Sequence, residues 1–226
     1  TVHDILAVLR GVLDHTAAQF PGMFPVIEVA HPRESRKEMR VLTREEQERL
    51  VTYLLADTDS CKFGVLLMML CGMRIGELCA LRWGNIDVRE RTVRITATMQ
   101  RLRDTAMTGD SRTRIVIGAP KSDTSLRVIP MTDYTAELCR RFMREDEEAF
   151  VLTGTEKYME PRALQYRIGK YTKACGLEGV HAHTLRHTFA TRAVEVGFEI
   201  KSLSEILGHE LTTDAEIVAA AAGVQA

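Results

Sequence analysis

Two arginines and two histidines stand in short segments whose residue types suit the binding of a phosphate group. His183, Arg186 and His187 are spaced i, i+3 and i+4, so they share one face at the start of an expected helix. A helix N-terminus favours anions because its N–H groups are unpaired and its macrodipole is positive there. Far upstream, Arg74 follows an apolar segment that ends in glycine. Since a guanidinium can bind two phosphate oxygens at once, these segments predict a phosphodiester site that works without a metal.

Glu77 lies three residues after Arg74, within reach of its guanidinium. A charge at the edge of an apolar core needs a partner, because an isolated buried charge is very costly. Two interpretations remain open. Glu77 forms a purely structural ion pair with Arg74, or it supports Arg74 while that guanidinium points at phosphate oxygens.

The chemistry-bearing residues also have plainer interpretations. The spacing of His183 and His187 matches that of zinc ligands, but the residues between them are Thr-Leu-Arg and the sequence shows no evident third ligand, so we expect no metal. Either histidine could be a core residue with satisfied hydrogen bonds. Lys121 could be a solvated lysine in a turn, and His209 follows Gly208, which could be an ordinary C-cap.

Composition restricts the class of protein. The chain has 226 residues, 45% of them hydrophobic, and a formal net charge of −1. A nucleic-acid partner would therefore need a local basic patch, since charges are screened beyond about 10 Å. The cysteines are odd in number without C-x-x-C spacing, which favours reduced thiols: Cys61, Cys71, Cys79, Cys139 and Cys175. With no signal peptide and no apolar run of bilayer-spanning length, we expect a cytoplasmic protein without membrane contact.

The periodicity predicts helices, then a small antiparallel sheet, then helices again. Helices are expected at 4–19, 43–56, 61–70, 75–81, 133–147, 161–175, 184–196 and 200–207, and strands at 92–99, 114–117 and 126–129. The main domain should begin at residue 43, because Thr43 and Glu46 form a capping-box pattern. The order predicts a mixed α+β, mostly helical domain over 43–226. Residues 1–22 would be the last helix of a preceding domain, or else an integral N-terminal helix, and 23–42 would be a linker.

Over about residues 43 to 213 the chain resembles the tyrosine recombinase (phage integrase) family, most closely the integrases of conjugative transposons. The segments that carry the resemblance are Gly72-Met73-Arg74-Ile75-Gly76-Glu77-Leu78 with Leu81-Arg82-Trp83, Pro120-Lys121-Ser122 with Ser125-Leu126-Arg127-Val128-Ile129-Pro130, His183-Thr184-Leu185-Arg186-His187-Thr188-Phe189-Ala190-Thr191, and Leu203-Ser204-Glu205-Ile206-Leu207-Gly208-His209. By this resemblance residues 1–22 would be the end of a core-binding domain.

The resemblance implies a reaction. In this family a tyrosine attacks a DNA phosphodiester, forms a 3′-phosphotyrosine and frees a 5′-hydroxyl, without a cofactor. Arg74 and Arg186 would hold the non-bridging oxygens, and Lys121 would protonate the leaving 5′-oxygen. His183 and His209 would handle protons or hydrogen bonds near the nucleophile. The family also implies a homo-tetramer on double-stranded DNA, with exchange of the C-terminal helix.

The sequence departs from the family pattern at the nucleophile. It should lie beyond His209, near Val218 and Ala219, where the chain has no tyrosine. All five tyrosines precede the H-x-x-R segment, which is His183-Thr184-Leu185-Arg186: Tyr53, Tyr134, Tyr158, Tyr166 and Tyr171. The tyrosine is missing or displaced, the chain was inactivated deliberately, or the protein is a natural relative that binds DNA without cutting it. Thr212-Thr213 resembles the threonines that precede the nucleophile in relatives, which favours the first explanation, and no nucleophile is assigned.

The leading hypothesis is a site-specific DNA recombinase, the integrase or transposase of a mobile element. A catalytically inactive, recombinase-like DNA-binding protein is the alternative, because no tyrosine follows His209. A type IB topoisomerase shares the chemistry but fits the integrase-like segments less well. Candidate DNA contacts are Arg33, Arg36, Lys37 and Arg40 in the linker and Arg101, Arg103, Arg112 and Arg114 around the loop between the expected strands 92–99 and 114–117. The same residues could form solvated faces, since acidic residues are interleaved with them.

Overall fold

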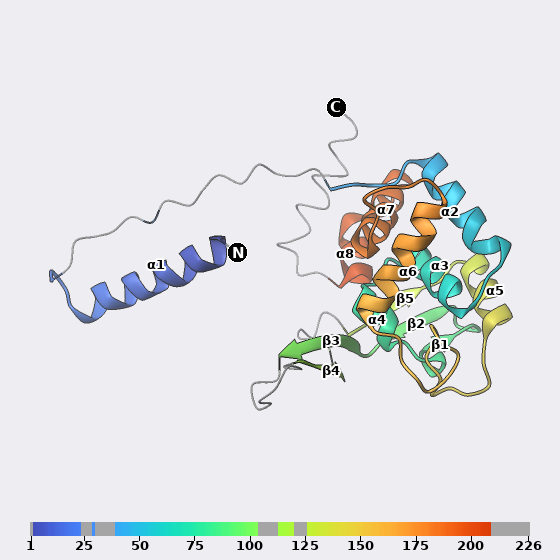
Figure 1. Cartoon of the computed structure of the whole chain (residues 1–226), viewed down its shortest axis with the longest axis horizontal. Helices are drawn as coiled ribbons and strands as arrows, with labels where there is room; N and C mark the ends of the chain where they lie inside the picture. The colour runs from blue at the N-terminus through green and yellow to red at the C-terminus, as the bar shows by residue number, and fades with distance from the viewer. Residues whose placement is uncertain (1, 24–28, 30–38, 104–112, 120–125, 209–226) are drawn as a thin grey trace. The chain divides into compact units, whose positions relative to one another are not determined.

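The computed structural model describes residues 2–23, 29, 39–103, 113–119 and 126–208 (Figure 1). The chain divides into two compact units, Thr1–Glu38 and Met39–Ala226. In the first unit the expected N-terminal helix is α1 (Val2–Gln19). The second unit begins at Met39, so the last residues of the expected linker pack with the main domain.

The second unit has the expected order of helices, strands and helices. Its helices are α2 (Arg44–Ala56), α3 (Ser60–Cys71), α4 (Ile75–Ala80), a 3-10 turn η1 (Trp83–Asn85), α5 (Asp133–Phe142), α6 (Pro161–Ala174), α7 (Ala182–Glu195) and α8 (Ile200–Leu207). Its strands are β1 (Ile86–Asp87), β2 (Thr92–Ile95), β3 (Thr98–Arg103), β4 (Thr113–Gly118) and β5 (Arg127–Pro130). The predicted mixed fold is confirmed.

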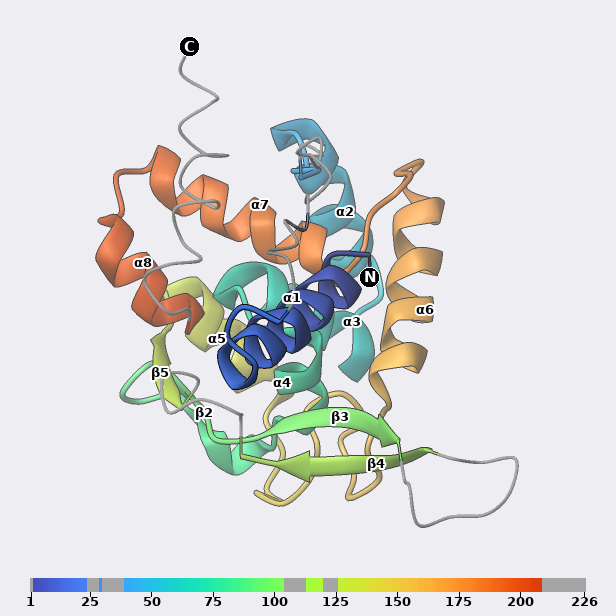
Figure 2. The same ribbon diagram turned by 90° about the vertical axis from the view of Figure 1, so that its left-hand side faces the viewer.

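The strands form two small antiparallel sheets. One has the order β1-β2-β5, and the register of its inner pair places Val93 opposite Ile129 and Ile95 opposite Arg127. The other is the hairpin β3-β4, which extends from the body of the unit (Figures 1 and 2). The predicted single strand 92–99 is wrong, because Thr96 and Ala97 separate β2 from β3 and the two strands pair in different sheets.

The core is built around α3, which is buried on nearly all sides as its apolar sequence predicts. The ring of Phe63 stacks on Trp83 and on Phe142, so α3 joins the η1 turn to α5. Within the described ranges, no helix is both long and apolar enough to cross a bilayer.

The start of the second unit is bonded to α7. Thr43 caps α2 and forms the expected capping box with Glu46. One residue earlier, the backbone N–H of Leu42 donates to the hydroxyl of Thr188 (3.0 Å), and its carbonyl accepts from Arg192 (2.7 Å). Both partners belong to α7, so these bonds fix α2 against the helix that carries the H-x-x-R segment.

Candidate functional site

A tight turn places Arg74. Helix α3 ends at Cys71, and Gly72 follows with φ +63, a backbone conformation that suits glycine. A Cβ atom on Gly72 would lie 2.4 Å from the ring of Phe189 in α7, so the turn also needs glycine for space. The chain then enters α4 with Arg74 as its N-cap residue. The turn thereby brings Arg74 next to α7.

Arg74 and Glu77 form the predicted contact. Nη1 of Arg74 donates to Oε1 of Glu77 (2.9 Å), and its backbone N–H donates to Oε2 (2.8 Å). Nη2 donates to the carbonyl of Gly208 (2.8 Å), at the end of α8. The side chain of Arg74 is 31% exposed and that of Glu77 only 2%. The Arg74 guanidinium is therefore held in place by hydrogen bonds, while part of the side chain remains accessible to solvent.

Arg127 belongs to this cluster, although the sequence did not lead us to predict it as a site residue. Nη1 and Nη2 of Arg127 donate to Oε1 and Oε2 of Glu77, each at 2.8 Å, and Nε donates to the carbonyl of Ile206. Its side chain is 5% exposed. The position of Arg127 in its strand could have indicated this role. Arg127 stands two residues before the buried Ile129, so the two side chains share the inward face of the strand. A charged side chain on that face needs a partner of opposite charge.

Arg186 is buried, and its guanidinium lies between two backbone segments. Nη1 donates to the carbonyl of Gly72 (2.5 Å) and Nη2 to the carbonyl of Leu207 (2.6 Å). The residue as a whole is 4% exposed. Arg186 therefore connects the turn before α4 to the end of α8.

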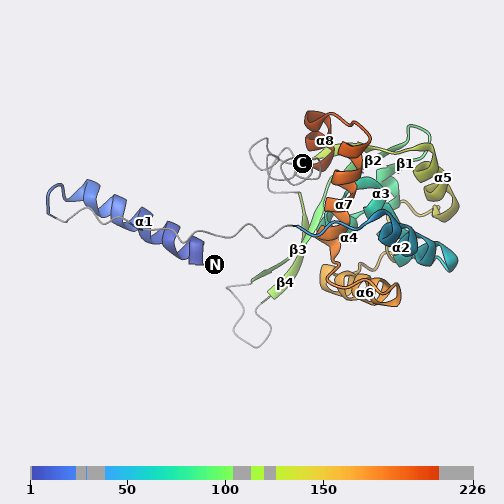
Figure 3. The same cartoon turned by 90° about the horizontal axis from the view of Figure 1, so that it is seen from above.

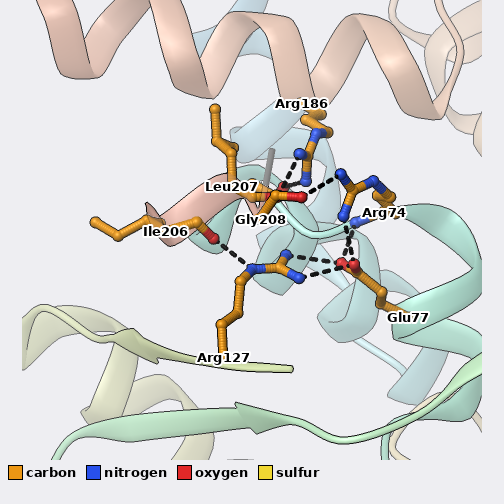
Figure 4. Close-up of polar contacts among 8 residues, drawn as sticks. Arg74, Glu77, Arg127, Arg186, Ile206, Leu207 and Gly208 are labelled. Atoms are coloured by element: carbon orange, nitrogen blue, oxygen red, sulfur yellow. Dashed lines mark hydrogen bonds and ion pairs between the residues drawn. The ribbon is translucent and has the colours of Figure 1, made fainter. Parts of the chain in front are cut away.

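Three arginines meet at the last turn of α8 (Figure 4). The consecutive carbonyls of Ile206, Leu207 and Gly208 accept hydrogen bonds from Arg127, Arg186 and Arg74, respectively. The C-terminal end of a helix carries partial negative charge and leaves its carbonyls without intrahelical donors. This helix end is therefore a scaffold for guanidinium groups that come from a strand, a helix and a turn.

The electrostatics of the cluster keep Glu77 ionised. Burial alone would raise the pKa of Glu77, but the hydrogen bonds and charge of Arg127 outweigh it and hold the pKa below its usual value; Arg74 and Arg186 act in the same direction. Among the described residues, Glu77 forms ion pairs with Arg74 and Arg127, and the charge of Arg186 also acts on it, so three guanidinium groups surround one carboxylate in this cluster. Such an excess of positive charge favours an anionic ligand.

The two histidines flank this cluster on α7. Their ring centroids lie 6.4 Å apart. Partial burial, followed by the charge of Arg186, lowers the pKa of His183; partial burial, followed by His183, lowers the pKa of His187. Both imidazoles are therefore mainly neutral at pH 7, and each can donate at one ring nitrogen and accept at the other. His183 is exposed and His187 half-buried, so His183 is not a core residue.

The start of α7 differs from the sequence-based expectation of free N–H groups. The N–H of Ala182 donates to the side chain of Gln165 (3.2 Å), and that of His181 to the hydroxyl of Thr184 (3.4 Å). An anion here would depend on arginine side chains more than on these two N–H groups. Within the described ranges, no group of three or more His, Cys, Asp and Glu residues is arranged to hold a metal ion.

The lowered histidine pKa values predict a pH effect on stability. Below the ordinary value of 6.5, the unfolded histidines bind protons that the folded ones resist, so the free energy of unfolding should fall as the pH drops below 6.5. We expect the variant His183→Gln/His187→Gln to show a shallower fall. Urea denaturation at a series of pH values measures this, and an equally steep fall in the variant would contradict it.

Several predicted site residues lie outside the described residues. These are Lys121, His209, Arg33, Arg36, Lys37, Arg112 and the position near Val218 and Ala219. Of the remaining candidate DNA contacts, Arg40 pairs with Glu46 (2.8 Å) and Arg101 pairs with Glu160 at the start of α6. Arg103 and Arg114 are exposed on the β3-β4 hairpin.

Helix α6 carries a basic face that the sequence analysis did not single out. Arg162, Tyr166, Lys170 and Lys173 recur at helical spacing and are all exposed. Nζ of Lys170 lies 4.9 Å from the ring centroid of Tyr166, and α6 contains no acidic residue. Gln165 bonds α6 to the start of α7. In the sequence, this basic face could have been recognised from the absence of Asp and Glu over residues 161–174.

The chain is similar in sequence to known recombinases. A sequence model described as "Phage integrase family" matches residues 40–217. The tyrosine recombinase XerA of Thermococcus kodakarensis is 28% identical over 82% of this chain and 60% of its own length, and a tyrosine recombinase of Pseudothermotoga lettingae is 27% identical over 82% and 57%. This chain thus spans about three fifths of the length of these relatives.

Solved structures share the fold. The Tn1549 transposon integrase in complex with a circular intermediate DNA superposes with a TM-score of 0.73 at 20% identity, over 96% of this chain and 74% of that one. A lambda integrase dimer bound to a COC′ core site gives 0.58 at 17% identity, over 94% and 71%. The matched family model covers the arginine cluster and α6 as well as most of the second unit. The chain belongs to the phage integrase family.

Proposed function

We propose that this chain is the catalytic part of a site-specific DNA recombinase, the integrase or transposase of a mobile element. Family membership supports this, and the observation that carries it is the convergence of Arg74 and Arg186. They come from distant segments and bind the neighbouring carbonyls of Gly208 and Leu207. A pair of guanidiniums at one point suits the non-bridging oxygens of a phosphodiester, whose charge grows in the pentavalent state.

The residue roles are part of the proposal. Arg74, which is partly exposed, reaches the phosphate, and Arg186 acts from a buried position beside it. His183, mainly neutral and exposed, exchanges protons or hydrogen bonds near the nucleophile. Lys121 protonates the leaving 5′-oxygen, and His209 has the same role as His183. Glu77 and His187 support them.

The nucleophile has no assignment among the described residues. All five tyrosines are described, and their contacts lie elsewhere: Tyr53 packs on Tyr171, Tyr158 on Phe150 and Tyr166 against Lys170, while Tyr134 is exposed on α5. The sequence after His209 holds no tyrosine. A recombinase relative that binds DNA without cutting it is the alternative function.

A nicked suicide substrate separates the two functions. The protein is incubated with nicked duplexes taken from the DNA that flanks its own gene, and the products are resolved on a denaturing gel. A covalent protein–DNA band, assigned by mass spectrometry to a tyrosine, is expected for a recombinase. Binding without a covalent band would support the non-cutting relative, and failure to bind any of these duplexes would contradict both.

Double-stranded DNA is the proposed partner, and α6 with the β3-β4 hairpin is its proposed contact surface. Arg101 bonds the hairpin to Glu160 at the start of α6, and Gln165 bonds α6 to α7. In Figure 2 the hairpin lies at the bottom of the second unit and α6 at its right, with α7 across the top and α8 at the left. Exposed basic side chains on this surface would bind phosphates.

The α6 surface gives a salt-dependence prediction. In the variant Arg162→Gln/Lys170→Gln/Lys173→Gln, the plot of log affinity against log salt concentration should be less steep by about 2 to 3, because each lost phosphate contact removes about 0.9. Titration of a labelled duplex at several salt concentrations measures the slope. The control is Arg140→Gln/Arg141→Gln on α5, which lies well apart from α6 in Figures 1 and 3. Equal slopes in the two variants would exclude α6 as the contact.

Assembly and location complete the proposal. A lambda integrase tetramer bound to a Holliday junction shares the fold, with a TM-score of 0.56 at 17% identity. By analogy we expect a homo-tetramer on DNA with exchange of the C-terminal helix, and a cytoplasmic location, where such DNA would be reached. Residues 1–22 would complete a core-binding domain.

A further inference from the structure

We propose that Arg127 is a positioning residue of the phosphate site, and that it sets the orientation of the Arg74 guanidinium through Glu77 and the end of α8. The inference rests on the proposed function only in taking phosphate as the ligand of Arg74. Arg127 is 5% exposed, whereas Arg74 is 31% exposed. A phosphodiester therefore reaches Arg74, and Arg127 acts from behind it.

The first connection runs through the carboxylate of Glu77. Arg127 binds both of its oxygens at 2.8 Å, so the plane of the carboxylate is fixed by two parallel hydrogen bonds. Each oxygen also accepts from Arg74: Oε1 from Nη1 and Oε2 from the backbone N–H. A rotation of the carboxylate away from Arg127 would therefore move the acceptor that aims Nη1 of Arg74.

The second connection runs through the end of α8. Nε of Arg127 donates to the carbonyl of Ile206, and Nη2 of Arg74 donates to the carbonyl of Gly208, two residues later. Arg127 thus contacts both structures that hold the Arg74 guanidinium. Because Glu77 and the end of α8 are both held in place, the Arg74 guanidinium is already ordered. It therefore has less conformational freedom to lose when it binds an anion.

A lysine at position 127 could not orient Glu77 and the end of α8 in the same way. Arg127 uses three nitrogens of one rigid plane, two toward Glu77 and one toward Ile206. A lysine ammonium preserves the charge but is a single point on a flexible stem. The substitution Arg127→Lys therefore keeps the ion pair with Glu77 while it removes the geometry.

The test is a double-mutant cycle between Arg127→Lys and Arg74→Ala, with inorganic phosphate as the probe. Binding is followed by NMR through the ring protons of His183, beside the cluster. We expect Arg127→Lys to weaken phosphate binding about tenfold, comparable to the loss of one charge-assisted hydrogen bond. In the Arg74→Ala background the same change should have no further effect, because Arg127 acts only through Arg74.

Each outcome has a defined meaning. An equal loss in both backgrounds would show a general structural role for Arg127 and overturn the inference. If Arg74→Ala weakens binding and Arg127→Lys does not, the inference is wrong while the proposed function stands. If Arg74→Ala binds phosphate as well as the unmodified chain, the phosphate site itself is wrong, and both fall. If Arg127→Lys does not fold, Glu77→Asp replaces it in the cycle. Aspartate keeps the negative charge but is one methylene shorter, so its carboxylate moves away from Arg74 and Arg127. The inference predicts the same dependence on Arg74 for this variant.

Discussion

Replacement of Glu77 by glutamine is expected to lower the free energy of unfolding by about 3–5 kcal/mol, the usual cost of removing one partner of a buried ion pair. Glu77 is 2% exposed and is the one carboxylate that the described residues place against Arg74 and Arg127. Glutamine retains the volume but loses the charge, and it presents an N–H group where a guanidinium already donates. Urea denaturation followed by circular dichroism measures the loss.

A matched control is Glu148→Gln. Glu148 pairs with Arg82 at 3.1 Å, but its side chain is 76% exposed, so the loss should stay within about 1 kcal/mol. The double variant Glu77→Leu/Arg127→Met should recover much of the stability, because apolar residues often replace a buried pair at little cost. A loss for Glu77→Gln no larger than that for Glu148→Gln would show that the cluster tolerates its net charge without Glu77.

If the chain is the proposed recombinase, replacement of Arg186 by alanine should slow DNA cleavage by at least about 10²–10³, the typical effect of removing one donor to a developing oxyanion. It should also destabilise the fold, because the carbonyls of Gly72 and Leu207 lose a buried donor, at about 1–3 kcal/mol each. DNA affinity should fall only modestly, since most of the proposed phosphate contacts lie on α6 and the β3-β4 hairpin. The covalent yield on the nicked duplex and the affinity for the same duplex measure the two effects.

Arg192→Ala serves as the control for Arg186→Ala. Arg192 lies on the same helix and also donates to a backbone carbonyl, that of Leu42. Its loss should reduce stability but leave the cleavage rate of the folded protein unchanged. A wholesale loss of DNA binding by folded Arg186→Ala would point to a structural role for Arg186, and an equal loss of cleavage in both variants would have the same meaning.

The sequence predicted the parts of the fold that depend on neighbouring residues. The capping box of Thr43 and Glu46 depends on residues three positions apart, and so does the contact between Arg74 and Glu77. Both are local enough to be read from spacing. The break between β2 and β3 was not predicted, because the apolar alternation continues through Ala97 and only the pairing partners differ.

The missed parts of the site depend on contacts between distant segments. Glu77 takes its bidentate partner from β5, and nothing near Glu77 in the sequence indicates Arg127. Likewise, the N–H of Ala182 is taken by Gln165 of the preceding helix, which changed the expected anion site at α7. The order of segments could be predicted from the sequence, but which distant side chain reaches which group could not.

The arrangement at the end of α8 bears on any attempt to graft this site onto another scaffold. Its acceptors are the main-chain oxygens of Ile206, Leu207 and Gly208, not side chains. A design that copied only the three arginines would lack the helix end, whose carbonyl groups separate and orient the guanidinium groups. A graft would need the three arginines together with the C-terminal end of a helix. The last three carbonyl groups of that helix would have to point toward the guanidinium groups.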